Sequence, residues 1–534
     1  MVISEGDIPR VQGPDRGPAA TRFRDTLADP AGFARLVELV PWAGSLSDAR
    51  ADKHLAMGRA LADDPRITGM TVTDNAGGHI KLSPLSLGRA LVEMGATVVA
   101  HMSCRDRSRG ALTTLAWDLA SAGMTDILAL SGDYPADGFG GMSRAVFDID
   151  SVALLDMLRG LDTDRVDYFA GCAINPYKLL ESELVPQFLK LAMKQRAGAR
   201  FTITQVGWDV RATDELLRWM RLNGVSIPAI ACVYILSAPV ARYFHGGKVP
   251  GASMADSLFS LVEEAATSPD KGRGRFLDIA AMQVAVARGL GFRGVYLAGQ
   301  RNAGEIDRIL TMADGYAADD WRDLASQVHF PRPGSFRMYA DGDASGVLAT
   351  DQFHPDHARS ITPKARKRSR SGVSIAYRFD RVVHDTVFAP ESKGFGVGRA
   401  FYAKAEQLRI GRPLHVLEQV AKAPLFECRD CGDCSLPEIA YLCPESQCVK
   451  NQRNGPCGGT NDGQCEIPGK PCIWAKAYDR LKPYGEELTM LERPPTVGDN
   501  ALRHESAWGN TFLGRDHAGR LRAASGEASG GTHQ

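Results

Sequence analysis

Short apolar segments alternate with longer amphipathic segments through the first 330 residues of the chain. Runs of apolar and β-branched residues predict eight strands, at 36–40, 69–73, 96–102, 126–130, 166–173, 201–206, 228–235 and 294–297. Helical periodicity between them predicts helices at 86–94, 110–122, 149–159, 179–196, 214–222 and 276–290. Eight successive β-then-α units favour an α/β fold of the (β/α)8 or TIM barrel type, with a doubly wound sheet as the weaker alternative.

A barrel predicts where functional side chains gather, because its active site lies at the carboxyl ends of the strands. Polar residues follow or end most of the predicted strands: Glu38, Thr73, Asp74, Asn75, His101, Ser131, Gly132, Asp133, Asn175, Gln205, Gln300, Arg301 and Asn302. Each alone has a structural explanation, such as an ion pair, a satisfied core histidine or a turn. Together they predict one polar site at the barrel mouth.

Composition excludes several classes of partner. Lys and Arg number 63 and Asp and Glu also number 63, so no overall charge draws in nucleic acid or a membrane surface. No apolar run reaches membrane-spanning length, which predicts a cytoplasmic protein. The basic cluster at 364–370 lacks interleaved aromatic residues, so a solvated linker is favoured there over a phosphate-binding site.

Cysteines are concentrated near the C-terminus. Eight of the eleven lie in one stretch that opens as C-x2-C-x2-C: Cys428, Cys431, Cys434, Cys443, Cys448, Cys457, Cys465 and Cys472. Eight thiolates suffice for two four-coordinate metal sites, and the many glycines and prolines among them indicate loop-borne ligands. A disulfide-stapled module is less favoured, because the N-terminus shows no signal-sequence pattern.

The identity of the metal stays open. Three cysteines at x2 intervals followed by Cys443-Pro444 resemble bacterial ferredoxin loops, although the last gap is eight residues instead of three, which favours an iron–sulfur cluster of the 4Fe–4S type. Zinc is the alternative. No histidine lies between Cys428 and Cys472, which disfavours mixed zinc sites but leaves all-cysteine zinc sites possible.

Several separated motifs in residues 33–310 resemble the methylenetetrahydrofolate reductase family, flavin-dependent (β/α)8 barrels of one-carbon metabolism. Their order and spacing agree with the family. They are VELVPW at 37–42, VT at 72–73, VAHMSCRDR at 99–107, LALSGDYP at 128–135 and AGARFTITQ at 197–205.

The resemblance implies catalytic roles for three residues. Glu38 would be the general acid that protonates N10 of 5,10-methylenetetrahydrofolate, for which a buried carboxyl with a raised pKa is suited. Asp133 would recognise the pterin and the flavin edge, and Gln205 would bind folate. Hydride would pass from flavin N5 to the folate carbon.

The resemblance also implies a flavin site, either FAD or FMN. The positions expected to contact it are Thr73, His101, Ser131, Gly132, Asp133, Asn175 and Lys194. Four positions depart from the family pattern: Trp42, Ser131, Asn175 and Gln187. These departures leave FAD, FMN and no flavin open. No G-x-G-x-x-G turn follows a predicted strand, so a separate nicotinamide domain is not expected.

The cysteine-rich region is similar to a domain found fused to, or beside, reductases of this family in anaerobes. The similarity rests on Leu417-Glu418, on the cysteine spacing, and on NGPCGG at 454–459. An iron–sulfur cluster there would relay electrons from a ferredoxin-like partner, with NAD(P)H as the other possible donor. Zinc would make the domain a structural brace.

Three functions are therefore considered. The favoured one is a reductase interconverting 5,10-methylene- and 5-methyltetrahydrofolate in either direction. The second is a flavin-free tetrahydrofolate-binding or methyl-transfer barrel with structural zinc, and the third is a non-catalytic scaffold. We expect a homo-oligomer with a flexible tail at 1–27, a barrel at 28–330, a linker at 331–375, a metal-binding domain at 376–504 and a flexible tail at 505–534.

Overall fold

The computed structural model of the 534-residue chain describes residues 21–490 and 493–524. Its centre is a closed barrel of eight parallel strands in the order β1-β10-β9-β8-β7-β4-β3-β2. These strands are β1 (Ala34–Leu39), β2 (Gly69–Val72), β3 (Val98–Ser103), β4 (Asp126–Leu130), β7 (Phe169–Ile174), β8 (Phe201–Thr204), β9 (Ala229–Tyr234) and β10 (Gly294–Ala298). All eight coincide with predicted strands, so the (β/α)8 prediction is confirmed.

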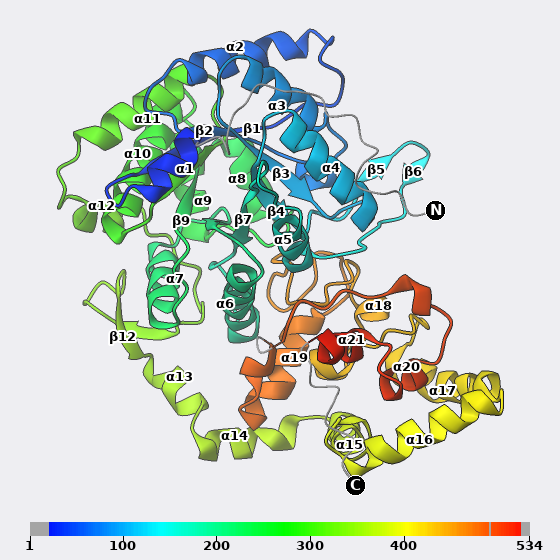
Figure 1. The fold of residues 1–534 in the computed structure, drawn as a ribbon. Helices are drawn as coiled ribbons and strands as arrows, with labels where there is room; N and C mark the ends of the chain where they lie inside the picture. Colours follow the sequence, from blue (N-terminus) through cyan, green and yellow to red (C-terminus); the bar gives the residue numbers. More distant parts are fainter. Residues whose placement is uncertain (1–20, 491–492, 525–534) are drawn as a thin grey trace.

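Helices surround the barrel and connect its strands (Figure 1). The six predicted helices are present as α3 (Pro84–Glu93), α4 (Arg109–Ser121), α5 (Ser151–Gly160), α6 (Glu181–Arg196), α7 (Val210–Leu222) and α10 (Arg273–Leu290). The remaining helices of this part are α2 (Arg50–Ala62), α8 (Ala238–His245), α9 (Asp256–Ala265), α11 (Ala303–Gly315) and α12 (Trp321–Gln327). A short hairpin, β5 (Asp137–Gly138) and β6 (Gly141–Met142), follows β4.

One end of the barrel is closed by α1 (Arg22–Ala28), all but the last residue of which lies in the segment 1–27 expected as a tail. Phe23 is fully buried and meets Phe201 edge-on at 5.1 Å between ring centroids. Arg24 and Thr21 bond to Asp126, the first residue of β4. Since these contacts lie at the amino ends of the strands, α1 seals that end and leaves the carboxyl end for a site. The rest of the expected tail, residues 1–20, lies outside the described residues.

Residues 331–375, expected as a linker, contain regular structure. The strands β11 (Tyr339–Asp341) and β12 (Ala349–Phe353) pair antiparallel, and α13 (Pro355–Ser360) and α14 (Pro363–Ser369) follow. The buried Arg211 of α7 anchors the hairpin, donating to Tyr339 O at 2.7 Å and Leu348 O at 2.8 Å. These contacts hold the segment on the barrel.

The C-terminal region packs against the barrel through α19 (Ile473–Leu481), which lies against α6. Helices α15 (Ile375–Val383), α16 (Lys393–Gln407) and α17 (Gly411–Phe426) form an arm that leads into it (Figure 1). The chain ends with α20 (Ala507–Phe512) and α21 (His517–Ala524), in the other segment expected as a tail, whose residues 525–534 lie outside the described part. No helix in the described part of the chain is both long and apolar enough to span a bilayer.

Residues 428–472, here called the cysteine module, consist mostly of loops with the short helix α18 (Pro444–Gln447). Left-handed backbone recurs, for example at Asp430, Gly432 and Gly458. A side chain on Gly432 would place its Cβ 1.7 Å from Leu502 O, so only glycine fits this turn. The loop-borne cysteines predicted from the glycine and proline content are thus observed.

Candidate active site

A cavity of about 260 Å³ lies at the carboxyl ends of the barrel strands. It collects every residue that the sequence predicted for catalysis or cofactor binding: Glu38, Thr73, His101, Ser131, Gly132, Asp133, Asn175, Lys194 and Gln205. Strand ends bring most of them there, and α6 supplies Lys194. Of the other predicted polar strand ends, Asp74 also lines the cavity, whereas Asn302 caps α11 by accepting from Glu305 N.

Glu38 projects from β1 toward Tyr296 of β10. The Tyr296 hydroxyl donates to Glu38 Oε1 at 2.5 Å. Burial raises the pKa of the Glu38 carboxyl, and the bond from Tyr296 and the charge of Lys81 oppose this rise only in part. A carboxyl that keeps its proton toward neutral pH can serve as a general acid.

Several buried polar atoms of the cavity wall have no hydrogen-bond partner within residues 21–490 and 493–524. They are Thr73 Oγ1, His101 Nε2, Gln187 Nε2 and Glu466 Oε2. Burial lowers the pKa of His101 to about 4, so its imidazole is neutral at physiological pH. Because buried polar groups are nearly always hydrogen-bonded, these atoms indicate a polar ligand. They fit a flavin or a pterin, both of which are rich in donors and acceptors.

Lys194 lines the same cavity. Its ammonium donates to Ala173 O at 2.6 Å, and burial lowers its pKa to about 8. The group therefore remains largely protonated at neutral pH and supplies a positive charge close to the ligand.

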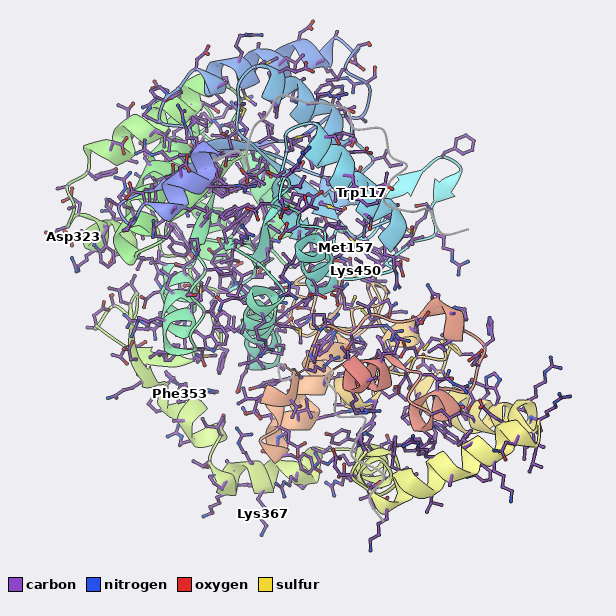
Figure 2. The ribbon with its side chains drawn as sticks, viewed as in Figure 1. Trp117, Met157, Asp323, Phe353, Lys367 and Lys450 are labelled. Carbon is purple, nitrogen blue, oxygen red and sulfur yellow. The ribbon has the colours of Figure 1, made fainter. Side chains whose placement is uncertain are left out.

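The cysteine module forms one wall of the cavity. Lys450, Cys457, Gly458, Gly459 and Glu466 line it together with the strand ends. Lys450, labelled in Figure 2 where module and barrel meet, donates to Gly132 O at 2.7 Å and pairs with Glu466 at 2.7 Å. The barrel and the module therefore share one site.

Two buried barrel lysines fasten the module. Lys178 donates to Gly458 O at 2.7 Å and to Thr460 O at 2.5 Å. Lys190 donates to Gly455 O at 3.0 Å and to Pro456 O at 3.1 Å. Sequence reasoning missed these lysines together with Lys450 and Glu466, since nothing in their local pattern reveals partners some 260 or more positions away.

Three of the four departures from the family pattern face the module. Ser131 Oγ donates to Gln452 Oε1 at 3.0 Å, and Asn175 Nδ2 donates to Gly458 O at 3.3 Å. A Cβ on Gly458 would lie 3.8 Å from Gln187 Oε1. These positions therefore carry small or amide side chains where the module loop docks.

The eight clustered cysteines form two groups of four. Cys428, Cys431, Cys434 and Cys443 line one small cavity. In the second group, Cys448, Cys465 and Cys472 all lie close enough to Cys457 for its charge to affect their pKa values. None of the eleven cysteines forms a disulfide. As placed, no three histidine, cysteine or acidic side chains in residues 21–490 and 493–524 converge tightly enough to hold a metal ion.

The donor set nevertheless suits thiolate metal sites. Backbone N–H groups point at sulfur in both groups, from Asp430 to Cys428 at 3.5 Å and from Gly459 to Cys457 at 3.4 Å. Such bonds stabilise sulfur-ligated centres. Burial raises the pKa of Cys448 and Cys472 to about 12, and a bound cation supplies the charge that deprotonates such thiols.

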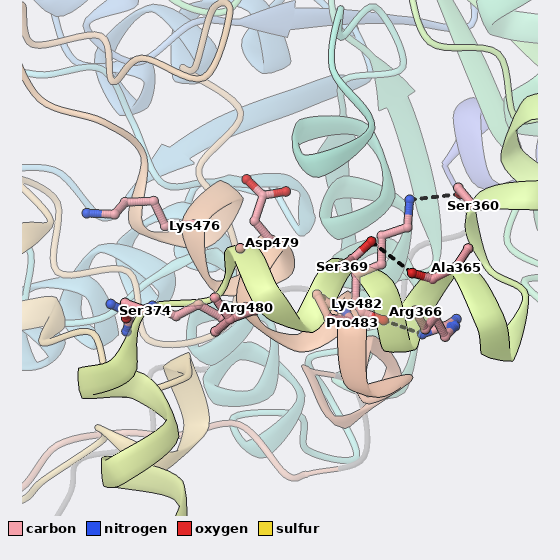
Figure 3. A pocket seen from close by; sticks show the side chains of 12 residues that line it. Ser360, Ala365, Arg366, Ser369, Ser374, Lys476, Asp479, Arg480, Lys482 and Pro483 are labelled. Carbon is pink, nitrogen blue, oxygen red and sulfur yellow. Dashed lines mark hydrogen bonds between the residues drawn. The ribbon is translucent and has the colours of Figure 1, made fainter.

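A larger cavity of about 690 Å³ lies elsewhere, between α14 and the end of α19 (Figure 3). Two of its cations are already paired: Arg366 with Glu487 at 2.5 Å and Lys482 with Glu181 at 2.6 Å. Lys482 also donates to Ser360 Oγ at 2.9 Å. Arg366 and Ser360 thus join the 331–375 segment to the C-terminal region, and Glu181 joins α6 to it. We therefore assign this cavity a structural role at the junction of these parts and place the chemistry in the barrel cavity.

Comparison with solved structures gives weak similarities. An uncharacterised protein from Clostridium thermocellum that binds two copies of 5-methyl-5,6,7,8-tetrahydrofolic acid has 11% identity and a TM-score of 0.39, covering 55% of this chain and 97% of that one. A tryptophan synthase from M. tuberculosis has 14% identity and a TM-score of 0.31, covering 58% of this chain and 100% of that one.

Sequence comparison is more informative. A probable methylenetetrahydrofolate reductase (NADPH) from Caenorhabditis elegans is 28% identical over 141 residues, 26% of this chain and 20% of that protein. The chain thus spans about a fifth of that relative's length. Residues 56–310 match the model of the methylenetetrahydrofolate reductase family, and residues 409–498 match that of the methylenetetrahydrofolate reductase C terminal. Because the two matched regions together span more than half of its residues, the chain belongs to the methylenetetrahydrofolate reductase family.

Proposed function

We propose that the chain interconverts 5,10-methylenetetrahydrofolate and 5-methyltetrahydrofolate at the carboxyl end of its barrel. The observation that carries this proposal is the meeting of Glu38, Asp133 and Gln205 in one cavity whose wall holds unpartnered polar atoms. Membership of the family supports the substrate class.

Glu38 is the proposed general acid. Opening the five-membered ring of the methylene substrate requires a proton at N10, and the raised pKa of Glu38 keeps that proton available. In the opposite direction the same carboxylate accepts the proton as the ring closes. Tyr296 orients the carboxyl through its 2.5 Å bond.

The site fits a flavin, which when bound would supply or accept the hydride. Thr73 and His101 would hold it with the unpartnered Oγ1 and Nε2 atoms. The carbonyl oxygen of Gly132 already accepts a hydrogen bond from Lys450. Lys194 adds a positive charge to the cavity wall. The Oδ2 atom of Asp133 accepts a hydrogen bond from Gly77 N at 2.8 Å, which fixes the carboxylate in the cavity wall. There it would bind the amino group of a pterin.

The two cysteine groups are proposed as iron–sulfur sites. Cys457 lines the substrate cavity, so a cluster in the second group would border the reacting molecules, and this position favours an electron-transfer role over a structural zinc site. A ferredoxin-like protein or NAD(P)H would then be the electron partner.

A second candidate is a flavin-free barrel that binds tetrahydrofolate or transfers a methyl group, with structural zinc in the module. The docking of the module on Ser131 and Asn175 favours it, because these positions are expected to contact the flavin. Protein that contains zinc, takes up neither FAD nor FMN and still binds 5-methyltetrahydrofolate would establish this candidate.

The Glu38→Gln variant tests the favoured function. We expect it to lose turnover of 5,10-methylenetetrahydrofolate while its flavin is still reduced by dithionite, since the amide cannot donate the N10 proton. Asp307→Asn, on the outer face of α11, is the control and should turn over normally. Normal turnover by Glu38→Gln would disprove the assignment of the acid.

A further inference from the structure

The cysteine module places a carboxylate inside the barrel cavity. The Glu466 side chain is only 2% exposed, although the residue belongs to a loop more than 300 positions from the barrel residues around it. Its Oε1 accepts from Lys450 Nζ at 2.7 Å and from Tyr134 N at 3.2 Å. One oxygen of the carboxylate is thus fixed by both the barrel and the module.

The other oxygen, Oε2, is buried and has no partner among the described residues, and the residue lines the cavity. Leaving a buried polar oxygen unpaired is costly, so an arrangement that holds it there needs a compensating contact. The Lys450 ammonium pairs with Oε1 and not with Oε2. The unpaired Oε2 therefore indicates that a bound ligand donates a hydrogen bond to it.

Gly459 makes room for this oxygen. A Cβ on Gly459 would lie 2.3 Å from Glu466 Oε2, so any larger residue would displace the carboxylate. The backbone of the same turn donates from Gly459 N to Cys457 Sγ at 3.4 Å. The loop is therefore shaped to keep the Glu466 carboxylate in the cavity.

The surroundings define the chemistry of the ligand group. Asp133 lies close enough for its charge to act on both Glu466 and Lys450. Two acceptor carboxylates beside the Lys450 ammonium suit a planar group with adjacent N–H and NH2 donors. The amino-pyrimidinone edge of a pterin has this pattern.

We propose that Glu466, supplied by the cysteine module, binds the amino-pyrimidinone edge of the pterin in the barrel cavity. This inference rests on the proposed function, because it assumes a folate substrate. It makes the module part of the substrate site, so the barrel alone has an incomplete pocket. Since Glu466 directly follows Cys465, the fold of the cysteine loop sets the position of the binding group.

The test measures binding of 5-methyltetrahydrofolate to the full-length protein by anaerobic calorimetry. Glu466→Gln keeps an oxygen for Lys450 but presents a donor to the donors of the ligand, and we expect affinity to fall about 10- to 100-fold. Gly459→Ala should weaken binding similarly by displacing the carboxylate. Glu445→Gln, which disturbs the Arg453 pair in the same module, should bind like the wild type.

A pterin analogue without the 2-amino group separates binding from a structural role. Wild-type protein should bind this analogue about 10-fold more weakly than the parent compound, whereas Glu466→Gln should discriminate less between the two. Wild-type affinity in both Glu466→Gln and Gly459→Ala, or undiminished discrimination in Glu466→Gln, would overturn the inference. Failure of the wild-type protein to bind 5-methyltetrahydrofolate would instead refute the proposed function and, with it, this inference.

Discussion

Replacing Tyr296 by Phe should shift the pH dependence of the proposed acid step. The Tyr296 hydroxyl donates to Glu38 Oε1 at 2.5 Å, a bond that favours the ionised carboxylate. Burial already raises the pKa of Glu38, and the bond opposes that rise. Loss of the hydroxyl should therefore raise the pKa further.

The size of the shift follows from the bond. A hydrogen bond to a charged group contributes about 1.5–3 kcal/mol, and one pKa unit corresponds to about 1.4 kcal/mol. Since the neutral acid retains part of the interaction with Tyr296, we expect a net rise of about one unit. The ring itself remains, so its stacking with His101 at 6.2 Å between centroids is preserved.

The assay is a single turnover of pre-reduced protein with 5,10-methylenetetrahydrofolate across pH. Reduction needs protonated Glu38, so the rate falls as pH rises through its pKa, and in Tyr296→Phe this fall should occur about one unit higher. Tyr234→Phe removes a hydroxyl from the same cavity and should keep the wild-type profile. A Tyr296→Phe profile that coincides with the wild type, or moves to lower pH, would refute the reasoning.

Three further substitutions test the docking and the stability of the cysteine module. Lys190→Met removes the ammonium that serves several buried acceptors and should destabilise the protein by about 3–5 kcal/mol in urea unfolding, whereas the exposed Lys364→Met should leave stability unchanged. Gly432→Ala introduces a clash with Leu502 O and a left-handed backbone cost of about 1–3 kcal/mol, so metal bound per chain should fall; full occupancy would contradict the role of that turn. Two carboxylates hold His517, and their effect outweighs that of burial and raises its pKa to about 9. The stability that the charged imidazole gives the folded protein should therefore be complete below about pH 6.5 and be lost as the pH rises through 9. Unfolding measured over this range should show the loss in wild type but not in His517→Ala.

The barrel could be predicted from the sequence because its signals are local. Each strand is a short apolar run, and parallel strands buried on both faces leave an unbroken pattern in the chain. The convergence of Glu38, Asp133 and Gln205 then follows from the topology, since all carboxyl ends of the strands meet at one end.

The contribution of the module to the site could not be predicted in this way. Lys190, Lys450 and Glu466 acquire their roles from contacts between residues hundreds of positions apart, which no periodicity encodes. The departures at Ser131 and Asn175 were visible in the sequence, but only the structure shows that both contact the module.

Segments without a strong hydrophobic pattern were also assigned too little structure. The α1 helix is only seven residues long, and only two of its residues, Phe23 and Leu27, are buried. Likewise, residues 331–375 read as polar linker, yet Arg211 organises the hairpin there through backbone carbonyls. Such anchoring depends on one distant side chain rather than on composition.

The most direct test of the central claim is an anaerobic absorption spectrum of the flavin-loaded protein before and after addition of 5-methyltetrahydrofolate. If the barrel cavity interconverts the two folates, the flavin bands should bleach on addition and return with 5,10-methylenetetrahydrofolate. A flavin spectrum that stays unchanged while 5-methyltetrahydrofolate is bound would contradict the proposed reaction.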